Sequence, residues 1–201
     1  MESTVIDQER FRQQIAFIVE IDKMKTELRK NIIIDKSRRE NDAEHSWHIA
    51  VMAMLLVEYS ELKVDLLKVI KILLVHDIVE IYAGDTFFYD EQANQDKAER
   101  EQAAADRIFA MLPVDQGQQL RALWEEYEAL QTNEALYAGA MDRLQPFLLH
   151  YYTQGQVWRQ ENVTSEKIYK RIGPLDKSMP RLWSVIDAMI QDAIRQGYIS
   201  K

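Results

Sequence analysis

The feature that most constrains the fold is a run of seventeen residues, 66–82, that is apolar on nearly every face of a helix. It holds no glycine or proline, so it predicts a continuous central helix. The polar stripe begun by Lys68 and Lys71 would continue at apolar positions. The run's other ionisable residues therefore lie off the solvent-facing side and point into the protein. They are His76, Asp77 and Glu80.

Ionisable side chains inside an apolar helix need partners, because an unpaired buried charge costs several kcal/mol. Glu80 is four residues after His76 and three after Asp77, which places it on a face adjoining both. Imidazole and carboxylate groups are ligands for divalent metals. The spacing favours a metal site, although two ligands do not complete one. The alternative is that these side chains satisfy one another in a hydrogen-bonded network within the core.

The composition sets further limits. A chain of 201 residues fits one domain with a stable core. The absence of cysteine excludes disulfides, thiolate catalysis and a cysteine-built zinc site, and it fits a cytoplasmic, reducing compartment. No apolar run reaches the ~18 residues of a membrane span, and residues 1–12 do not resemble a secretion signal. A net charge of −8 argues against binding a nucleic-acid polymer.

Positive charge nevertheless gathers in residues 23–39, where seven of the seventeen positions are lysine or arginine. Such a cluster suits a small anionic ligand, while a solvated basic loop is the plainer interpretation.

The rest of the sequence predicts an all-α protein with no sheet, because no strand-like alternation persists. We expect a single domain, 1–201, with a core at about 8–152 and a C-terminal helical extension at 153–201. A basic connection spans 29–42, and Asp42 is the expected cap of the helix that follows. The expected helices are 8–28, 43–59, 66–82, 92–111, 115–130 and 134–152, then a tail at 158–201 with a loop near 173–174 and a last helix through 183–190.

Two more residues are candidate metal ligands. His45 stands near the start of a helix, where a capping or core role is the alternative. Asp142 lies among small and apolar residues, where pairing with Arg143 or a distant base is the alternative. Pro146 has no amide hydrogen to donate to the carbonyl of residue 142, so a bend beside this acid is expected.

Together these residues resemble a known family. The order His45, then His76-Asp77 31 residues later, then Asp142 is similar to the ligand set of HD-domain metal-dependent phosphohydrolases. Longer strings resemble the 5′-deoxynucleotidase-like branch of that family, over nearly the whole chain. These strings are Arg38-x-Glu40-Asn41-x-x-Glu44-His45-Ser46, His76-Asp77-x-x-Glu80 and Gly84-Asp85.

The resemblance implies a helical bundle and a set of site residues. One divalent ion (Mn, Co, Fe, Ni or Zn) would be bound by four ligands, His45, His76, Asp77 and Asp142. Glu80 would be the catalytic acid/base that activates water. The expected substrate and phosphate contacts are Arg29, Asp85, Arg38 and Trp47. Lys30 follows Arg29 where family members have tryptophan, which leaves the base and sugar contacts open.

The predicted activity is hydrolysis of a phosphomonoester, a 5′-nucleotide or deoxynucleotide, to nucleoside and phosphate by a homodimer. The aromatic residues 87–89 are candidates for a nucleoside pocket or for the core. A non-catalytic HD module that binds a nucleotide and signals is the main alternative, and a helical interaction protein is a second. Glu80 discriminates between them, because ligand binding alone needs no acid/base beside a metal.

Overall fold

The computed structural model describes residues 6–199, and it confirms the predicted all-helical architecture apart from one small hairpin. None of the described helices has the length and apolar character needed to cross a membrane. The first half contains α1 (Gln8–Glu20), the 3₁₀ turn η1 (Ile21–Lys25), α2 (Asp42–Leu56), η2 (Val57–Tyr59), α3 (Leu66–Val75) and α4 (Glu80–Ala83). The second half contains α5 (Lys97–Phe109), α6 (Val114–Ala129), α7 (Asn133–Tyr152), α8 (Gln156–Gln160), α9 (Ser165–Ile172), α10 (Leu175–Ser178) and α11 (Pro180–Arg195).

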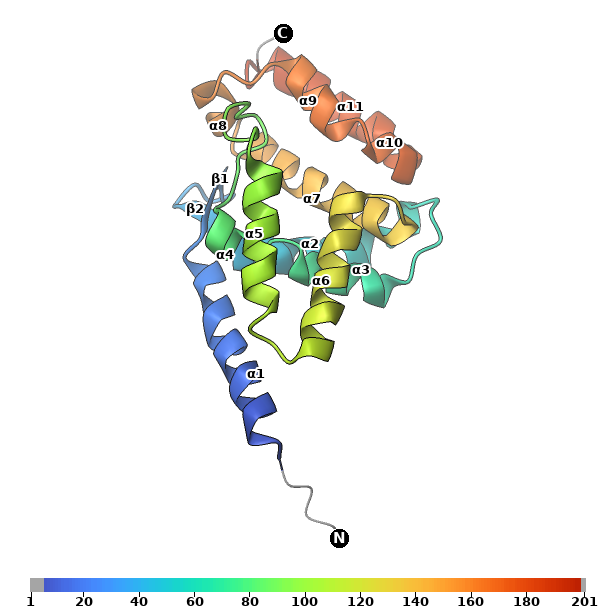
Figure 1. Cartoon of the computed structure of the whole chain (residues 1–201). Helices are drawn as coiled ribbons and strands as arrows, with labels where there is room; N and C mark the ends of the chain where they lie inside the picture. The colour runs from blue at the N-terminus through green and yellow to red at the C-terminus, as the bar shows by residue number, and fades with distance from the viewer. Residues whose placement is uncertain (1–5, 200–201) are drawn as a thin grey trace.

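Helices α2, α3 and α7 pack against one another at the centre of the molecule. Helices α5 and α6 stand side by side in front of them, and α1 leads away at the opposite end from α9 and α11 (Figure 1). The main apolar core joins α2, α3 and α7 to the C-terminal helices through fully buried residues such as Ile49, Ile72, Met141, Trp158 and Ile190. The C-terminal segment therefore packs on the same core as the preceding helices.

The prediction of no sheet is wrong for the basic connection. Strands β1 (Leu28–Ile32) and β2 (Arg39–Asn41) form an antiparallel hairpin with an irregular register. Side chains alternate along it, and Asn31 and Glu40 point inward and are buried. Because these inward positions are polar and face the interior site, the apolar alternation that identifies a half-buried strand is missing.

The expected continuous helix over 66–82 is also wrong, because α3 ends at Val75 and α4 begins at Glu80. Between them the backbone closes three-residue turns, with the amide of Ile78 donating to Val75 and that of Glu80 donating to Asp77 at 2.9 Å. In this geometry residues three apart lie over one another. The tightened turn therefore places the side chains of Asp77 and Glu80 on the same side.

The start of α2 differs from the prediction by one residue, and this matters for the site. Asn41, rather than Asp42, caps the helix, in a reciprocal capping box with Glu44. Asp42 thereby falls inside the first turn, where it is fully buried. At the end of α4, Gly84 has a φ of 76°, as expected for a glycine that terminates a helix. Helix α7 continues through Pro146 to Tyr152, and the bend stays a prediction.

Candidate metal centre

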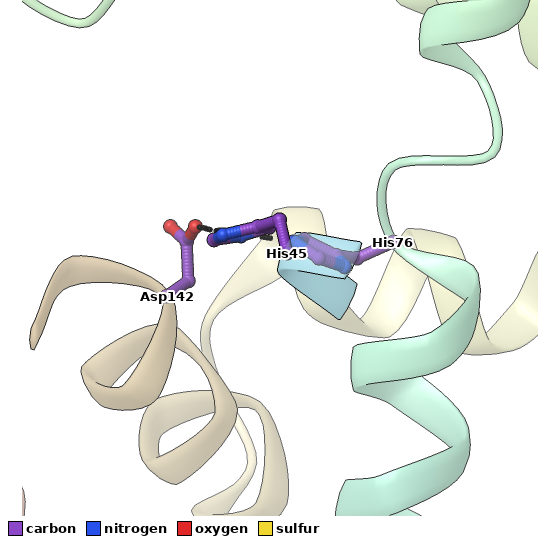
Figure 2. A group of neighbouring side chains, drawn as sticks. All are labelled: His45, His76 and Asp142. Atoms are coloured by element: carbon purple, nitrogen blue, oxygen red, sulfur yellow. Dashed lines mark ion pairs between the residues drawn. The ribbon is translucent and has the colours of Figure 1, made fainter. Parts of the chain in front are cut away.

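Three elements bring the predicted metal ligands together. His45 comes from α2, His76 and Asp77 from the turn after α3, and Asp142 from α7. Figure 2 shows His45, His76 and Asp142 turned toward one another. Asp142 Oδ1 lies 3.3 Å from His45 Nε2 and 3.9 Å from His76 Nε2. Asp77 joins the group, with Oδ1 3.1 Å from His76 Nε2 and Oδ2 3.7 Å from His45 Nε2.

Hydrogen bonds on the far side of each imidazole fix its orientation. His45 Nδ1 lies 3.1 Å from Gln145 Oε1, and His76 Nδ1 lies 2.9 Å from the carbonyl oxygen of Leu73. Both partners are acceptors in this arrangement, so each Nδ1 carries the hydrogen and donates. The Nε2 atoms then present their lone pairs to the centre of the cluster, as in metal-binding histidines.

These atoms fit a cation. The Nε2 atoms of His45 and His76 are buried and have no hydrogen-bond partner. One potential ligand atom from each of His45, His76 and Asp142 lies within 4.8 Å of the other two. Imidazole lone pairs and carboxylate oxygens are all acceptors, so they repel one another unless a proton or a metal ion lies between them. The donor set of two nitrogens and two carboxylates suits a divalent transition metal.

The charges around the histidine cluster also favour a bound cation. Burial and Arg29 lower the pKa of His45, yet Asp142, Glu40 and Asp77 outweigh them and raise it to about 9. Burial raises the pKa of Asp142, but Arg171 and the two histidines bring it well below its usual range. Carboxylates thus dominate the cluster, and it attracts positive charge. The ion pair with Arg171 also means that Asp142 does have a distant basic partner, through Oδ2.

A second group of buried carboxylates surrounds Arg29 beside the histidines. Four of them lie within 4 Å of Arg29 Nη1: Asp77 at 2.7 Å, Asp42 at 3.1 Å, Asp85 at 3.6 Å and Glu80 at 3.7 Å. Burial, together with the charge of Asp77, raises the pKa of Glu80 well above its ordinary value. Glu80 Oε2 is buried without a hydrogen-bond partner. A proton acceptor therefore stands next to the histidine cluster.

A cavity of about 200 Å³ opens onto both groups. Residues of the histidine cluster and of the Arg29 group form its polar wall. The other wall is built from the aromatic residues 87–89, of which Phe88 and Tyr89 pack edge to face with ring centroids 5.3 Å apart. The side-chain amide of Asn94 holds their loop in place by donating a hydrogen bond to the carbonyl oxygen of Phe87 at 3.0 Å. The lining of the cavity thus contains both charged and aromatic side chains.

Two predicted substrate contacts lie away from this cavity. Trp47 is 63% exposed, because it follows His45 by two residues and a helix turns about 200° over that interval. Arg38 is exposed and pairs at 2.6 Å with Glu44, the partner of Asn41 in the capping box of α2. Arg29 and Asp85 do line the cavity.

Several residues of the site were missed in the sequence. Gln145 orients His45 and donates to Glu40, which is itself buried. Its position three residues after Asp142, on the same helix face, was a signal that could have found it. Arg143 and Arg171 also line the cavity. Arg171 lies 29 residues beyond Asp142 and carried no local signal.

The chain is similar to known proteins. The family profile described as "HD domain" matches residues 21–183. The chain is 33% identical to the 5′-deoxynucleotidase HDDC2 of Dictyostelium discoideum over 61% of its own length and 67% of that protein. It is 33% identical to the human 5′-deoxynucleotidase HDDC2 over 55% of its length and 53% of that protein. The chain thus spans about half to two thirds of the length of these curated relatives.

Solved structures show the same fold. A predicted metal-dependent phosphohydrolase from Magnetospirillum magnetotacticum MS-1 is 48% identical and superposes with a TM-score of 0.92, covering 98% of this chain and 99% of that one. A conserved hypothetical protein from Pyrococcus furiosus is 22% identical, with a TM-score of 0.60 over 90% of this chain and 99% of that one, and shares the fold.

Proposed function

Since this chain belongs to the HD-domain family, we propose that it is a metal-dependent phosphohydrolase that hydrolyses 5′-nucleoside or deoxynucleoside monophosphates to nucleoside and phosphate. The observation that carries the proposal is the convergence of two unpartnered imidazole nitrogens and two carboxylates beside a cavity that Glu80 also lines. The Oε2 atom of Glu80 is buried and has no hydrogen-bond partner. The names of the curated relatives and of the Magnetospirillum protein support both the reaction and its metal dependence.

We assign His45, His76, Asp77 and Asp142 as the ligands of one divalent ion (Mn, Co, Fe, Ni or Zn). Such an ion would supply a Lewis acid that lowers the pKa of water and offsets charge on the phosphoryl oxygens. Hydrogen bonds from His45 and His76 to Gln145 and Leu73 keep the imidazoles oriented for that role.

Glu80 is the proposed general base. Its Oε2 is free of hydrogen bonds, so it can take the proton of the water that attacks phosphorus. Arg29 holds Asp77 and Glu80 in position through its ion pairs. Asp85 and Arg29 remain the proposed contacts near the phosphate, and the aromatic residues 87–89 are the proposed contacts of the nucleoside. Residues of this kind give a cavity shape and an apolar stacking surface for a base.

Two broader expectations accompany this function. A homodimer and a cytoplasmic location stay predictions, and mass measurement in solution and fractionation of cells test them.

The activity is tested by measuring phosphate release from a panel of 5′-nucleoside and deoxynucleoside monophosphates. The protein is first treated with a chelator and then reloaded separately with Mn, Co, Ni or Zn. We expect metal-dependent release that Glu80→Gln abolishes while the protein still binds its ion. Asp77→Asn is expected to lose the ion itself.

The outcome also separates the two function classes. One ion bound per chain with no phosphate release from any nucleotide would favour a nucleotide-binding or signalling module. Full activity in Glu80→Gln would exclude this residue as the base.

A further inference from the structure

Arg143 is a half-buried cation at the wall of the cavity. It lies on α7 directly after Asp142 and lines the cavity. Its Nη1 donates to the carbonyl oxygen of Gly139 at 2.6 Å. Within residues 6–199 no carboxylate lies within ion-pair distance of its guanidinium. Gly139 leaves the space that this conformation needs, since a Cβ there would lie 2.6 Å from Arg143 Nη1.

Arg171 adds a second guanidinium next to the first. It reaches in from α9, and its Nη2 pairs with Asp142 Oδ2 at 2.9 Å. Its guanidinium carbon also lies 4.3 Å from the ring centroid of Phe88, on the aromatic wall. Burial lowers the pKa of Arg143, and the charge of Arg171 lowers it further. Among residues 6–199, Asp142 is thus the one carboxylate within ion-pair distance of either guanidinium, and it pairs with Arg171 alone.

This arrangement is costly unless an anion completes it. A guanidinium has five N–H donors, and like charges held together away from water destabilise the fold. Within the described part of the chain, the donors of Arg143 have one protein acceptor, the carbonyl of Gly139. Both arginines face the cavity that contains the candidate metal ligands, and a planar guanidinium fork matches the oxygens of a phosphate group.

We propose that Arg143 and Arg171 form an anion site that binds the phosphate of the substrate beside Asp142. Identifying the anion as a phosphomonoester rests on the proposed function, and inorganic phosphate, the expected product, has the same binding chemistry. Arg143 binds the phosphate, whereas Arg171 binds it and also orients Asp142.

Calorimetric titration with inorganic phosphate tests the site without turnover. It is performed on metal-free protein, where the arginines act alone, and on manganese-loaded protein. We expect Arg143→Gln and Arg171→Gln to weaken phosphate binding about 10- to 100-fold, the loss typical of hydrogen bonds to charged groups. Lys170→Gln, an exposed cation one residue before Arg171, is the matched control and should bind phosphate like the wild type.

Metal affinity distinguishes the roles of the two arginines. Arg143→Gln should leave manganese affinity unchanged, because Arg143 does not pair with a ligand. Arg171→Gln should change it, because the carboxylate of Asp142 loses its partner. Arg143→Lys keeps the charge but not the fork, and an intermediate phosphate affinity is expected. It also tests the site if Arg143→Gln does not fold.

The failure of the anion site and the failure of the proposed phosphohydrolase activity give different results. Equal phosphate affinity in the wild type and in both folded arginine variants, or no phosphate binding by the wild type at millimolar concentration, overturns the anion site even if the enzyme is active. If no nucleotide is hydrolysed but phosphate still binds through Arg143, the anion site stands and the proposed reaction fails.

Discussion

Two arginine environments line the same cavity and have opposite surroundings. Arg29, at the hairpin, has four carboxylates within 4 Å of one nitrogen. Arg143, on α7, has a backbone carbonyl and a neighbouring cation. The first environment has an excess of negative charge, and the second an excess of positive charge. A phosphomonoester bound with a metal ion would complement both.

The difference indicates that Arg29 stabilises the fold, whereas the guanidinium of Arg143 is available to a ligand. The guanidinium of Arg29 is matched by carboxylates of the hairpin, α2 and the turn before α4, so removing it would leave several buried anions without a partner. The guanidinium of Arg143 pairs with no carboxylate among residues 6–199, so removing it would leave none of them without a partner. We therefore expect the stability of the fold to depend far more on Arg29 than on Arg143.

The largest expected effect is that of Arg29→Met. It leaves buried carboxylates uncompensated, and we expect the metal-free protein to lose about 3–5 kcal/mol of its free energy of unfolding. Urea unfolding with and without manganese measures this loss, and bound metal should restore part of it. Arg38→Met, in an exposed ion pair of the same hairpin, should leave stability almost unchanged. Equal losses in the two variants would contradict a structural role for Arg29.

The second effect concerns His150, which is buried and forms no ion pair with a carboxylate of residues 6–199. Burial lowers the pKa of His150 to about 4, whereas His45, among carboxylates, has a pKa of about 9. Below pH 6.5 the unfolded chain therefore protonates residue 150 while the folded protein does not. Stability should fall as the pH drops from 6.5 to 4, by about 3 kcal/mol from this residue.

His150→Leu should remove that part of the pH dependence. Denaturant unfolding of chelated wild type and variant between pH 7 and pH 4 gives the difference, in which the other titrating groups cancel. Parallel pH profiles in the two proteins would show that His150 is already charged in the fold.

The third effect acts on metal binding through an orienting residue. In Gln145→Leu the Nδ1 of His45 loses its acceptor, and we expect the affinity for manganese to fall about 10- to 100-fold. Competition with a chromophoric chelator measures the affinity. Gln160→Leu, an exposed change on α8, is the control. Unchanged affinity in Gln145→Leu would show that packing alone orients the imidazole.

The smallest effect is expected from the second arginine environment. Arg143→Gln removes one hydrogen bond to Gly139 and relieves repulsion from Arg171, so the free energy of unfolding should change by less than about 1 kcal/mol. Urea unfolding in the absence of phosphate tests this. A loss as large as that of Arg29→Met would mean that Arg143 is structural, and the contrast between the two environments would disappear.

Much of the helical architecture could be predicted from the sequence, because apolar periodicity is a local property. The limits of α6 and α7 are within a residue of those expected, and Gly84 ends its helix as predicted. The interruption of α3 at His76 was not predicted, since the run from Leu66 to Tyr82 is apolar on nearly every face and holds no glycine or proline. The hairpin was missed because its inward residues are polar.

The sequence by itself determined the chemical types at the site. It supplied His45, the His76-Asp77 pair, Glu80 and Asp142, and the tertiary structure brings them together beside one cavity, which all of them except His45 line. Their spacing along the helix and the resemblance to a family were enough to identify them as candidate site residues.

Only the tertiary structure decided how charge is balanced around these residues. It placed Asp42 in the interior and matched Arg29 to carboxylates from distant segments. It also turned Trp47 outward and brought Arg171 from α9 to Asp142. The physical reason is that electrostatic energy depends on distances between side chains and on their burial, and residues far apart in the chain acquire both only when the helices pack.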